Sequence, residues 1–103
     1  MALPMNDTRL KFMEAIARRR TITALYNGAE LTLAPHLMFE RRGDLFVGAL
    51  NLNKNWRSDE EPRLGQFKLD GLGAAEVRDE EFEPLPSFEP APPTEIDTLV
   101  LAV

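Results

Sequence analysis

The sequence predicts a mainly β domain with one N-terminal helix, in which short strands form a small, strongly bent sheet or barrel. Two observations predict this fold. A helical repeat of apolar residues is confined to residues 8–19, whereas the later apolar segments are short, rich in β-branched and aromatic residues, and bounded by turn signals. The length of 103 residues allows one domain, and a hydrophobic content of 44% is sufficient for one shared core.

Residues 8–19, TRLKFMEAIARR, form the predicted helix. Its apolar side chains fall on one continuous arc, which we expect to face the sheet. They are Leu10, Phe12, Met13, Ile16 and Ala17. Glu14 and Arg18 form an i,i+4 pair on the opposite side. The arginines at 18–20 place positive charge at the helix C-terminus, where the helix dipole favours it, and phosphate binding is the alternative for these residues.

The first predicted strands form a hairpin. TITALY (21–26) and AELTLA (29–34) flank Asn27-Gly28, which is a strong signal for a two-residue turn. We expect Pro35 to break or restart the hydrogen-bonded ladder before HLMFE (36–40).

The remaining strands follow at short intervals. LFVGAL (45–50) is apolar on both faces, so we expect a central strand that is bent or bulged at Gly48. Residues 51–63 form a long polar loop, of a length that is often functional. LGQFKL (64–69) and the segment DGLGAAEV (70–77) supply the last strands of the predicted barrel, whose open end or edge the helix would cover.

Charge and proline divide the chain into three parts. Residues 1–83 form the predicted barrel domain with its helix, residues 84–95 a proline-rich acidic linker, and residues 96–103 an apolar segment. Residues 1–78 hold all 12 basic residues, and residues 79–103 hold 7 acidic residues and no basic one. We expect the apolar segment to be an edge strand of its own sheet or a contact in a homodimer.

Several functional classes are disfavoured by the sequence. It has no cysteine, no signal-peptide pattern and no apolar run long enough for a membrane helix, so we expect a cytoplasmic protein. We find no phosphate-binding glycine loop, nucleophile elbow or pair of histidines, and therefore expect no enzyme, metal or cofactor. The lone histidine, His36, is expected to be structural or on the surface.

The order of landmarks resembles the WYL domain family. AIARRRTITALY is followed by a glycine turn, a strand with APHL, RRGDLFVGAL, a variable loop, FKLDGL and Phe82. The resemblance covers roughly residues 9–83, and it implies a small Sm-like or SH3-like β-barrel. Family members resemble effector-binding parts of bacterial regulators. The resemblance therefore implies a regulatory or ligand-sensing module that binds a nucleotide, another anionic ligand or nucleic acid.

The sequence departs from the family pattern at several positions. Residues 45–47 are Leu-Phe-Val in place of Trp-Tyr-Leu. In GQFKLDGL, Gly65 and Gly71 replace two arginines of the family motif, Lys68 keeps the middle positive charge, and Arg63 is a nearby substitute for the first arginine. The helix-turn-helix domain that usually precedes a WYL domain has no counterpart before residue 8, so we expect a stand-alone module.

Five residues are candidates for the ligand site. Lys68 alternates with Phe67 and Leu69, so it faces away from the core, where it is either solvated or in contact with a phosphate or carboxylate. The resemblance adds Arg63 to this site, and Tyr26 would either pack its ring on the barrel or, as the resemblance implies, contribute to the pocket. Trp56 would either fold over the barrel mouth or stack on a base. Asp70 would either cap the following turn or contact the ligand.

Two other functions are compatible with the sequence. The proline-rich tail and apolar C-terminal segment would suit a protein-interaction adaptor or a dimerisation module. Arginines at residues 18–20 and 41–42, together with Trp56, would suit a non-specific binder of single-stranded nucleic acid if the fold brought them together. The acidic tail opposes the nucleic-acid function, because it would repel phosphates.

Overall fold

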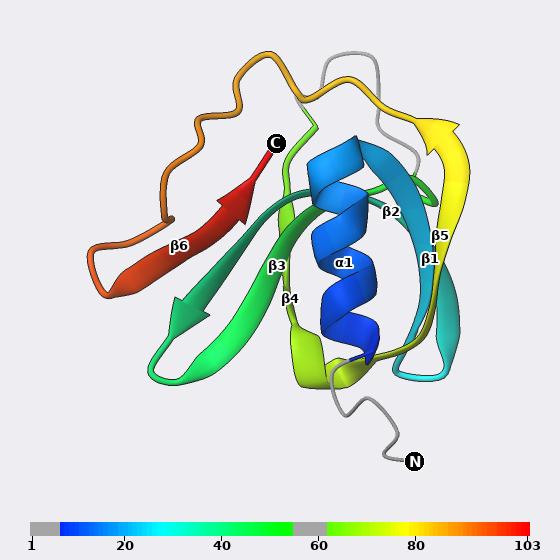
Figure 1. Cartoon of the computed structure of the whole chain (residues 1–103), viewed down its shortest axis with the longest axis horizontal. Helices are drawn as coiled ribbons and strands as arrows, with labels where there is room; N and C mark the ends of the chain where they lie inside the picture. Colours follow the sequence, from blue (N-terminus) through cyan, green and yellow to red (C-terminus); the bar gives the residue numbers. More distant parts are fainter. Residues whose placement is uncertain (1–6, 55–61) are drawn as a thin grey trace.

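The computed structural model describes residues 7–54 and 62–103 of the chain, which form one helix and a six-stranded antiparallel sheet (Figure 1). The elements are α1 (Asp7–Arg18), β1 (Arg20–Tyr26), β2 (Ala29–Arg41), β3 (Asp44–Asn51), β4 (Gly65–Lys68), the single-turn 3-10 helix η1 (Leu69–Gly71), β5 (Leu72–Glu81) and β6 (Asp97–Ala102). The predicted mainly β fold with one helix is confirmed. The sheet is barrel-like but does not close on itself.

The strands are ordered β4-β3-β2-β1-β5, and β6 pairs with β2 outside this path. The strand β2 is the centre of the fold, because it pairs with β3 along most of its length and with two further strands on its other edge. Its first half, from Ala29 to Leu33, pairs with β1, and its second half, from Leu37 to Arg41, pairs with β6. In Figure 1, β6 and β1 lie on opposite sides of α1.

The change of partner occurs at Pro35 and His36, where β2 continues without ending. Pro35 pairs with Ala49 and Leu37 with Gly48, so His36 is an extra residue on the β2 side, as in a β-bulge. The sequence predicted an irregularity at Gly48, and the structure places the bulged residue on the opposing strand. Pro35 has no N–H to donate to a neighbouring strand. It lies just beyond Leu33, where the pairing of β2 with β1 ends, so no hydrogen bond to β1 is lost.

Two hairpins have turns with both central residues at positive φ. Asn27 and Gly28 have φ of 52° and 80°, which confirms the predicted turn between β1 and β2. Arg42 and Gly43, with φ of 52° and 85°, make the same kind of turn between β2 and β3. Such turns match the twist of paired strands, which explains why glycine occupies the second position of each.

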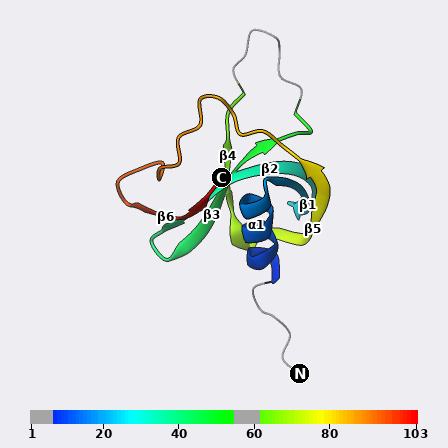
Figure 2. The same cartoon turned by 45° about the horizontal axis from the view of Figure 1, so that its top comes forward.

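The helix α1 crosses the concave face of the sheet and closes the core (Figure 2). Phe12, Ala15 and Ile16 are fully buried, whereas Leu10 is 53% exposed and Ala17 is also exposed. The predicted apolar arc was therefore correct at its centre and wrong at Leu10 and Ala17. No helix within residues 7–54 and 62–103 has the length and apolar character needed to cross a membrane.

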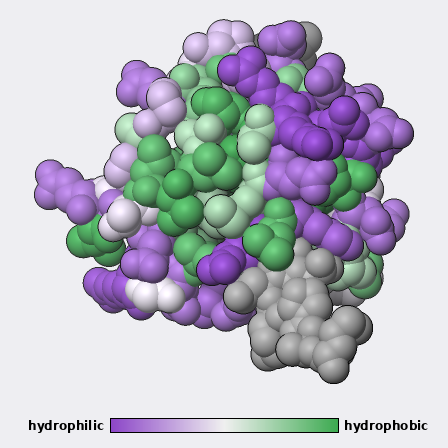
Figure 3. Space-filling view, viewed as in Figure 1, coloured by the Kyte–Doolittle hydropathy of each residue, from purple (hydrophilic) through white to green (hydrophobic). Residues whose placement is uncertain are grey.

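Residues 82–96, which we call the strap, connect β5 to β6 without helix or strand. The strap contains all five prolines of the predicted linker and runs across the open part of the sheet (Figure 2). It brings β6 back to pair with β2, and Leu101 and Val103 then pack against the core. Val100 remains 44% exposed, and Figure 3 shows apolar residues gathered on the β6 side of this view.

Candidate functional site

A groove of about 220 Å³ lies between the strap and the face of the sheet that points away from α1, which we call the outer face. The sheet contributes residues of β2, β3 and β4 and the residue before β4, and the strap contributes the opposite wall. The lining residues are Leu37, Phe39, Gly48, Leu64, Gln66, Phe88, Glu89, Ala91 and Pro93. The groove is mainly apolar, with one amide and one carboxylate.

Strand alternation explains why these residues face the groove. Met38, Val47 and Phe67 pair across neighbouring strands and belong to the core side, where Phe67 packs partly buried against the core. Their neighbours along each strand therefore point to the outer face. Gly48 makes room for the side chain of Leu37, because a Cβ added at Gly48 would overlap that side chain.

Lys68 lies on the outer face, two residues beyond Gln66 along β4 and directly opposite Phe46 of β3. Its Nζ is 3.6 Å from the Oδ2 of Asp44, and both side chains are about half exposed. An ion pair this exposed contributes little to stability and exchanges readily with other partners. The lysine is thus available to an anion that reaches the groove along β4.

Arg41 lies at one side of the outer face, where it forms an ion pair with the buried carboxylate of Asp97 in β6. Its Nε donates to Oδ1 at 2.6 Å and its Nη2 donates to Oδ2 at 2.9 Å, while the carboxylate side chain is 0% exposed. The guanidinium carbon also lies 5.3 Å and 5.2 Å from the ring centroids of Phe39 and Phe46, which stack on each other. Hydrogen bonds from Arg41 lower the pKa of Asp97 to about 2.

His36 fixes the beginning of the strap to the bulge in β2. Its Nδ1 lies 2.8 Å from the carbonyl oxygen of Ala34, and the backbone N–H of Leu85 donates to its Nε2 at 3.0 Å. These two contacts require the neutral ring with the proton on Nδ1. Phe82 and Phe88 flank the ring, with centroids 5.1 Å and 5.2 Å away. Burial lowers the pKa of His36, against the opposing effect of the hydrogen bond to Ala34.

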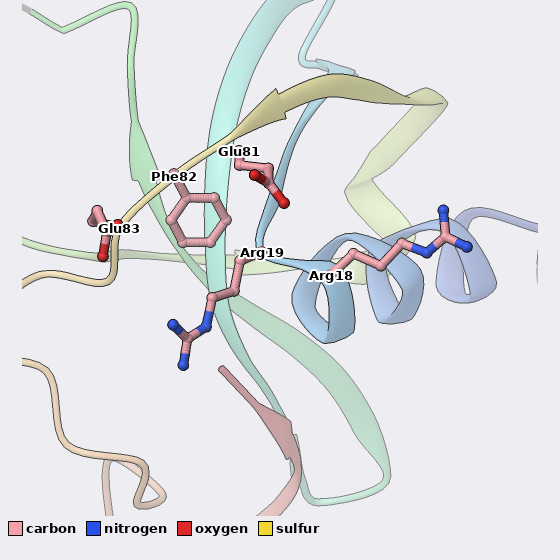
Figure 4. A pocket seen from close by; sticks show the side chains of 5 residues that line it. All are labelled: Arg18, Arg19, Glu81, Phe82 and Glu83. Atoms are coloured by element: carbon pink, nitrogen blue, oxygen red, sulfur yellow. The ribbon is translucent and has the colours of Figure 1, made fainter.

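A second hollow, of about 270 Å³, lies where α1 meets the end of β5 (Figure 4). It is lined by Arg18, Arg19, Glu81, Phe82 and Glu83. The Arg18 side chain points away from Phe82 along the helix, where its guanidinium pairs with Glu14 at 3.4 Å. Arg19 has a φ of 55°, and its carbonyl accepts the N–H of Phe82, so it ends the helix in the left-handed conformation. Mixed charge and these structural roles make this hollow a weaker candidate.

The structure does not bring together the predicted site residues that it describes. Tyr26 lies on the core side, where its ring meets Phe67 edge-on at 5.3 Å, so it does not share the face of Lys68. Arg63 is exposed beside Leu64 of the groove, and Asp70 is exposed in η1. Trp56 lies outside the described residues. Lys68 therefore shares the sheet face of the groove, and the sequence pattern did not identify Leu37, Phe39, Gln66 or Phe88 as the groove's lining.

The arginines do not form one basic patch in the part of the chain that the structure describes. Arg18, Arg20 and Arg41 pair with Glu14, Asp79 and Asp97, respectively. Figure 1 shows the hairpin between β2 and β3 at the opposite end of the molecule from the last turn of α1. This arrangement weakens the case for non-specific nucleic-acid binding.

Among residues 7–54 and 62–103, no three side chains of histidine, cysteine, aspartate or glutamate form a group that could hold a metal ion. The sequence matches no family model, no curated protein and no solved structure. The groove and Lys68 on the same sheet face are the features of the molecule that indicate a function.

Proposed function

We propose that this chain is a non-enzymatic, regulatory ligand-binding module, and that its ligand occupies the groove on the outer face. The observation that carries the proposal is an apolar groove on the same sheet face as Lys68. The ligand class is an anion with a flat apolar body, of which a nucleotide is the leading candidate. The body would lie between Leu64 and Phe88, above the buried side chains of Leu37 and Phe39, and the anionic group would replace Asp44 as the partner of Lys68.

Size and polarity support this class of ligand. A volume of about 220 Å³ is below the range of about 300–1,000 Å³ that is usual for drug-sized ligands, so the groove suits one ring system of a ligand whose remaining part lies outside it. The amide of Gln66 offers the hydrogen-bonding groups that fix the orientation of a heteroaromatic ring. The resemblance to WYL domains independently implies an anionic effector.

Other parts of the proposal come from the sequence and await their own tests. They are a homodimer, a cytoplasmic location and a role in bacterial regulation. An adaptor function through a free C-terminal tail is less well supported, because β6 and the strap already contact β2 of the same chain. A partner that used β6 would have to compete with these internal contacts.

The test is a titration of the full chain with AMP and with 8-anilinonaphthalene-1-sulfonate, an aromatic anion whose fluorescence reports binding. We expect saturable binding of at least one of them, and a loss of at least about fivefold in affinity for Lys68→Ala. Arg78→Ala is the matched control, because Arg78 is an exposed cation on β5 that pairs with Glu80 at 3.3 Å. Equal affinities in both variants would remove Lys68 from the site, and no saturable binding of either compound would contradict the proposal.

A further inference from the structure

The strap forms one wall of the groove, so a ligand in the groove contacts the sheet and the strap together. From this arrangement we infer that the strap is the element through which the module signals occupancy: it opens to admit the ligand, closes on it, and passes the change to β6. This inference depends on the proposed function, since it assigns the regulation of the same groove.

The strap is fastened at two points. At its beginning, the Leu85 N–H donates to His36, and the rings of Phe82 and Phe88 enclose the imidazole. At its end, the carboxylate of Asp97 accepts hydrogen bonds from Arg41 and from the backbone N–H of Thr94. Both fastenings join the strap or its junction with β6 to β2, at positions on either side of the groove residues Leu37 and Phe39.

Between these points the strap is weakly held. In this stretch the backbone N–H of Phe88 donates to Leu85 and that of Ala91 donates to Glu89, both local hydrogen bonds, and residues 89–96 are all exposed. Prolines at 84, 86, 90, 92 and 93 cannot donate to a sheet and restrict the backbone. Few buried contacts and few backbone hydrogen bonds are typical of segments that open at a lower free energy than the strands around them.

Phe88 couples the groove to the first fastening. Its ring contacts His36 edge-on and also lines the groove, so a ligand that packs on Phe88 stabilises the His36 contact. The far end of the strap leads directly into β6, whose Asp97 is held by Arg41 beside the groove residues Phe39 and Gln66. A ligand in the groove therefore stabilises the contacts at both ends of the strap and the pairing of β6 with β2.

Hydrogen–deuterium exchange on the full chain tests this inference. With 8-anilinonaphthalene-1-sulfonate bound, we expect exchange to slow at least about threefold in residues 82–96 and in β6, with little change in β1 and β5. His36→Gln removes the aromatic ring from the first fastening. We expect it to speed exchange of the strap without ligand and to weaken probe affinity. Ser87→Ala is the control, because Ser87 is an exposed residue of the same strap.

The outcomes separate this inference from the proposed function. Saturable, Lys68-dependent binding with unchanged exchange in residues 82–96 would overturn the role of the strap and leave the groove as the site. If His36→Gln prevents folding, Phe88→Ala replaces it, because this half-buried side chain can be removed without disturbing the bulge in β2. Unchanged strap exchange in Phe88→Ala would also overturn the inference.

Discussion

The Arg41 guanidinium and the Asp97 carboxylate form a bidentate ion pair that joins β2 to β6 across 56 residues of sequence. The pair lies beside the stacked rings of Phe39 and Phe46, so one contact fixes both the last strand and one side of the outer face. Removing one partner of a buried ion pair leaves the other charge uncompensated, which lowers the free energy of unfolding. We therefore expect substitutions at this pair to destabilise the fold.

Asp97→Asn is expected to lower the thermal midpoint by several degrees, because it leaves the Arg41 guanidinium without its charged partner. In the wild type, the pKa of Asp97 is lowered from 3.8 to about 2. The stabilisation is therefore complete above pH 3.8 and is lost as the pH falls toward 2. Thermal scans at pH 7, 4, 3 and 2 measure this, and a variant that keeps the acid-dependent loss of the wild type would contradict the assignment.

His36 predicts a second pH dependence in a separate range. Its pKa is lowered in the folded protein from the ordinary 6.5, so the unfolded chain takes up a proton before the folded one does. The free energy of unfolding is thus expected to fall as the pH decreases below 6.5, with a slope no steeper than one proton, until the folded-state pKa is reached. Urea unfolding between pH 8 and 5 checks the prediction. The slope should be absent in His36→Gln, and a similar slope in both proteins would exclude His36 as its source.

Asp44→Asn and Lys68→Ala form a matched pair that should change anion binding in opposite directions. Asp44 competes with an incoming anion for Lys68, so its neutralisation is expected to raise affinity for 8-anilinonaphthalene-1-sulfonate by about two- to fivefold. Fluorescence titration at low and high salt measures both variants, and screening should reduce the difference between them. A lower affinity in Asp44→Asn would show that the anionic group does not reach Lys68.

Gly48→Ala tests the groove itself. The added methyl group would displace the Leu37 side chain, which lines the same groove, so we expect weaker probe binding and a stability cost of about 1–3 kcal/mol. Gly73→Ala on β5 is the control, since nothing lies within 4 Å of a Cβ built there. Unchanged probe affinity in Gly48→Ala would move the binding site away from the floor of this groove.

Local sequence signals predicted much of the fold. The Asn27-Gly28 turn, the helix ending at the arginines and the alternation of Phe67 with Lys68 all depend on neighbours in the chain, and each is found in the structure. The path of β2 through Pro35 was harder to predict, because its continuation depends on β3 and β6. The low β-strand propensity of a proline does not reveal whether distant strands will pair on either side of it.

The candidate site was predicted only in part, because its walls come from distant segments. Lys68 was placed on the correct face by alternation, but the Leu85 N–H that meets His36 lies 49 residues away in sequence. A lone histidine after a proline gives no sign of such a partner. Tyr26 was assigned to the site by resemblance, and the structure puts it with Phe67 because alternation directs both rings to the core side.

The position of β2 between three partner strands has a consequence for how the protein is made. During synthesis, β1, β2 and β3 emerge early and can pair with each other, whereas β6 emerges only after the strap. Until then, the edge of β2 from Leu37 to Arg41 has no strand beside it in the nascent chain, and such an edge attracts other chains. Completion of the sheet thus depends on a strand that is synthesised after the strap, and shortening β6 should lower soluble yield before it affects the core.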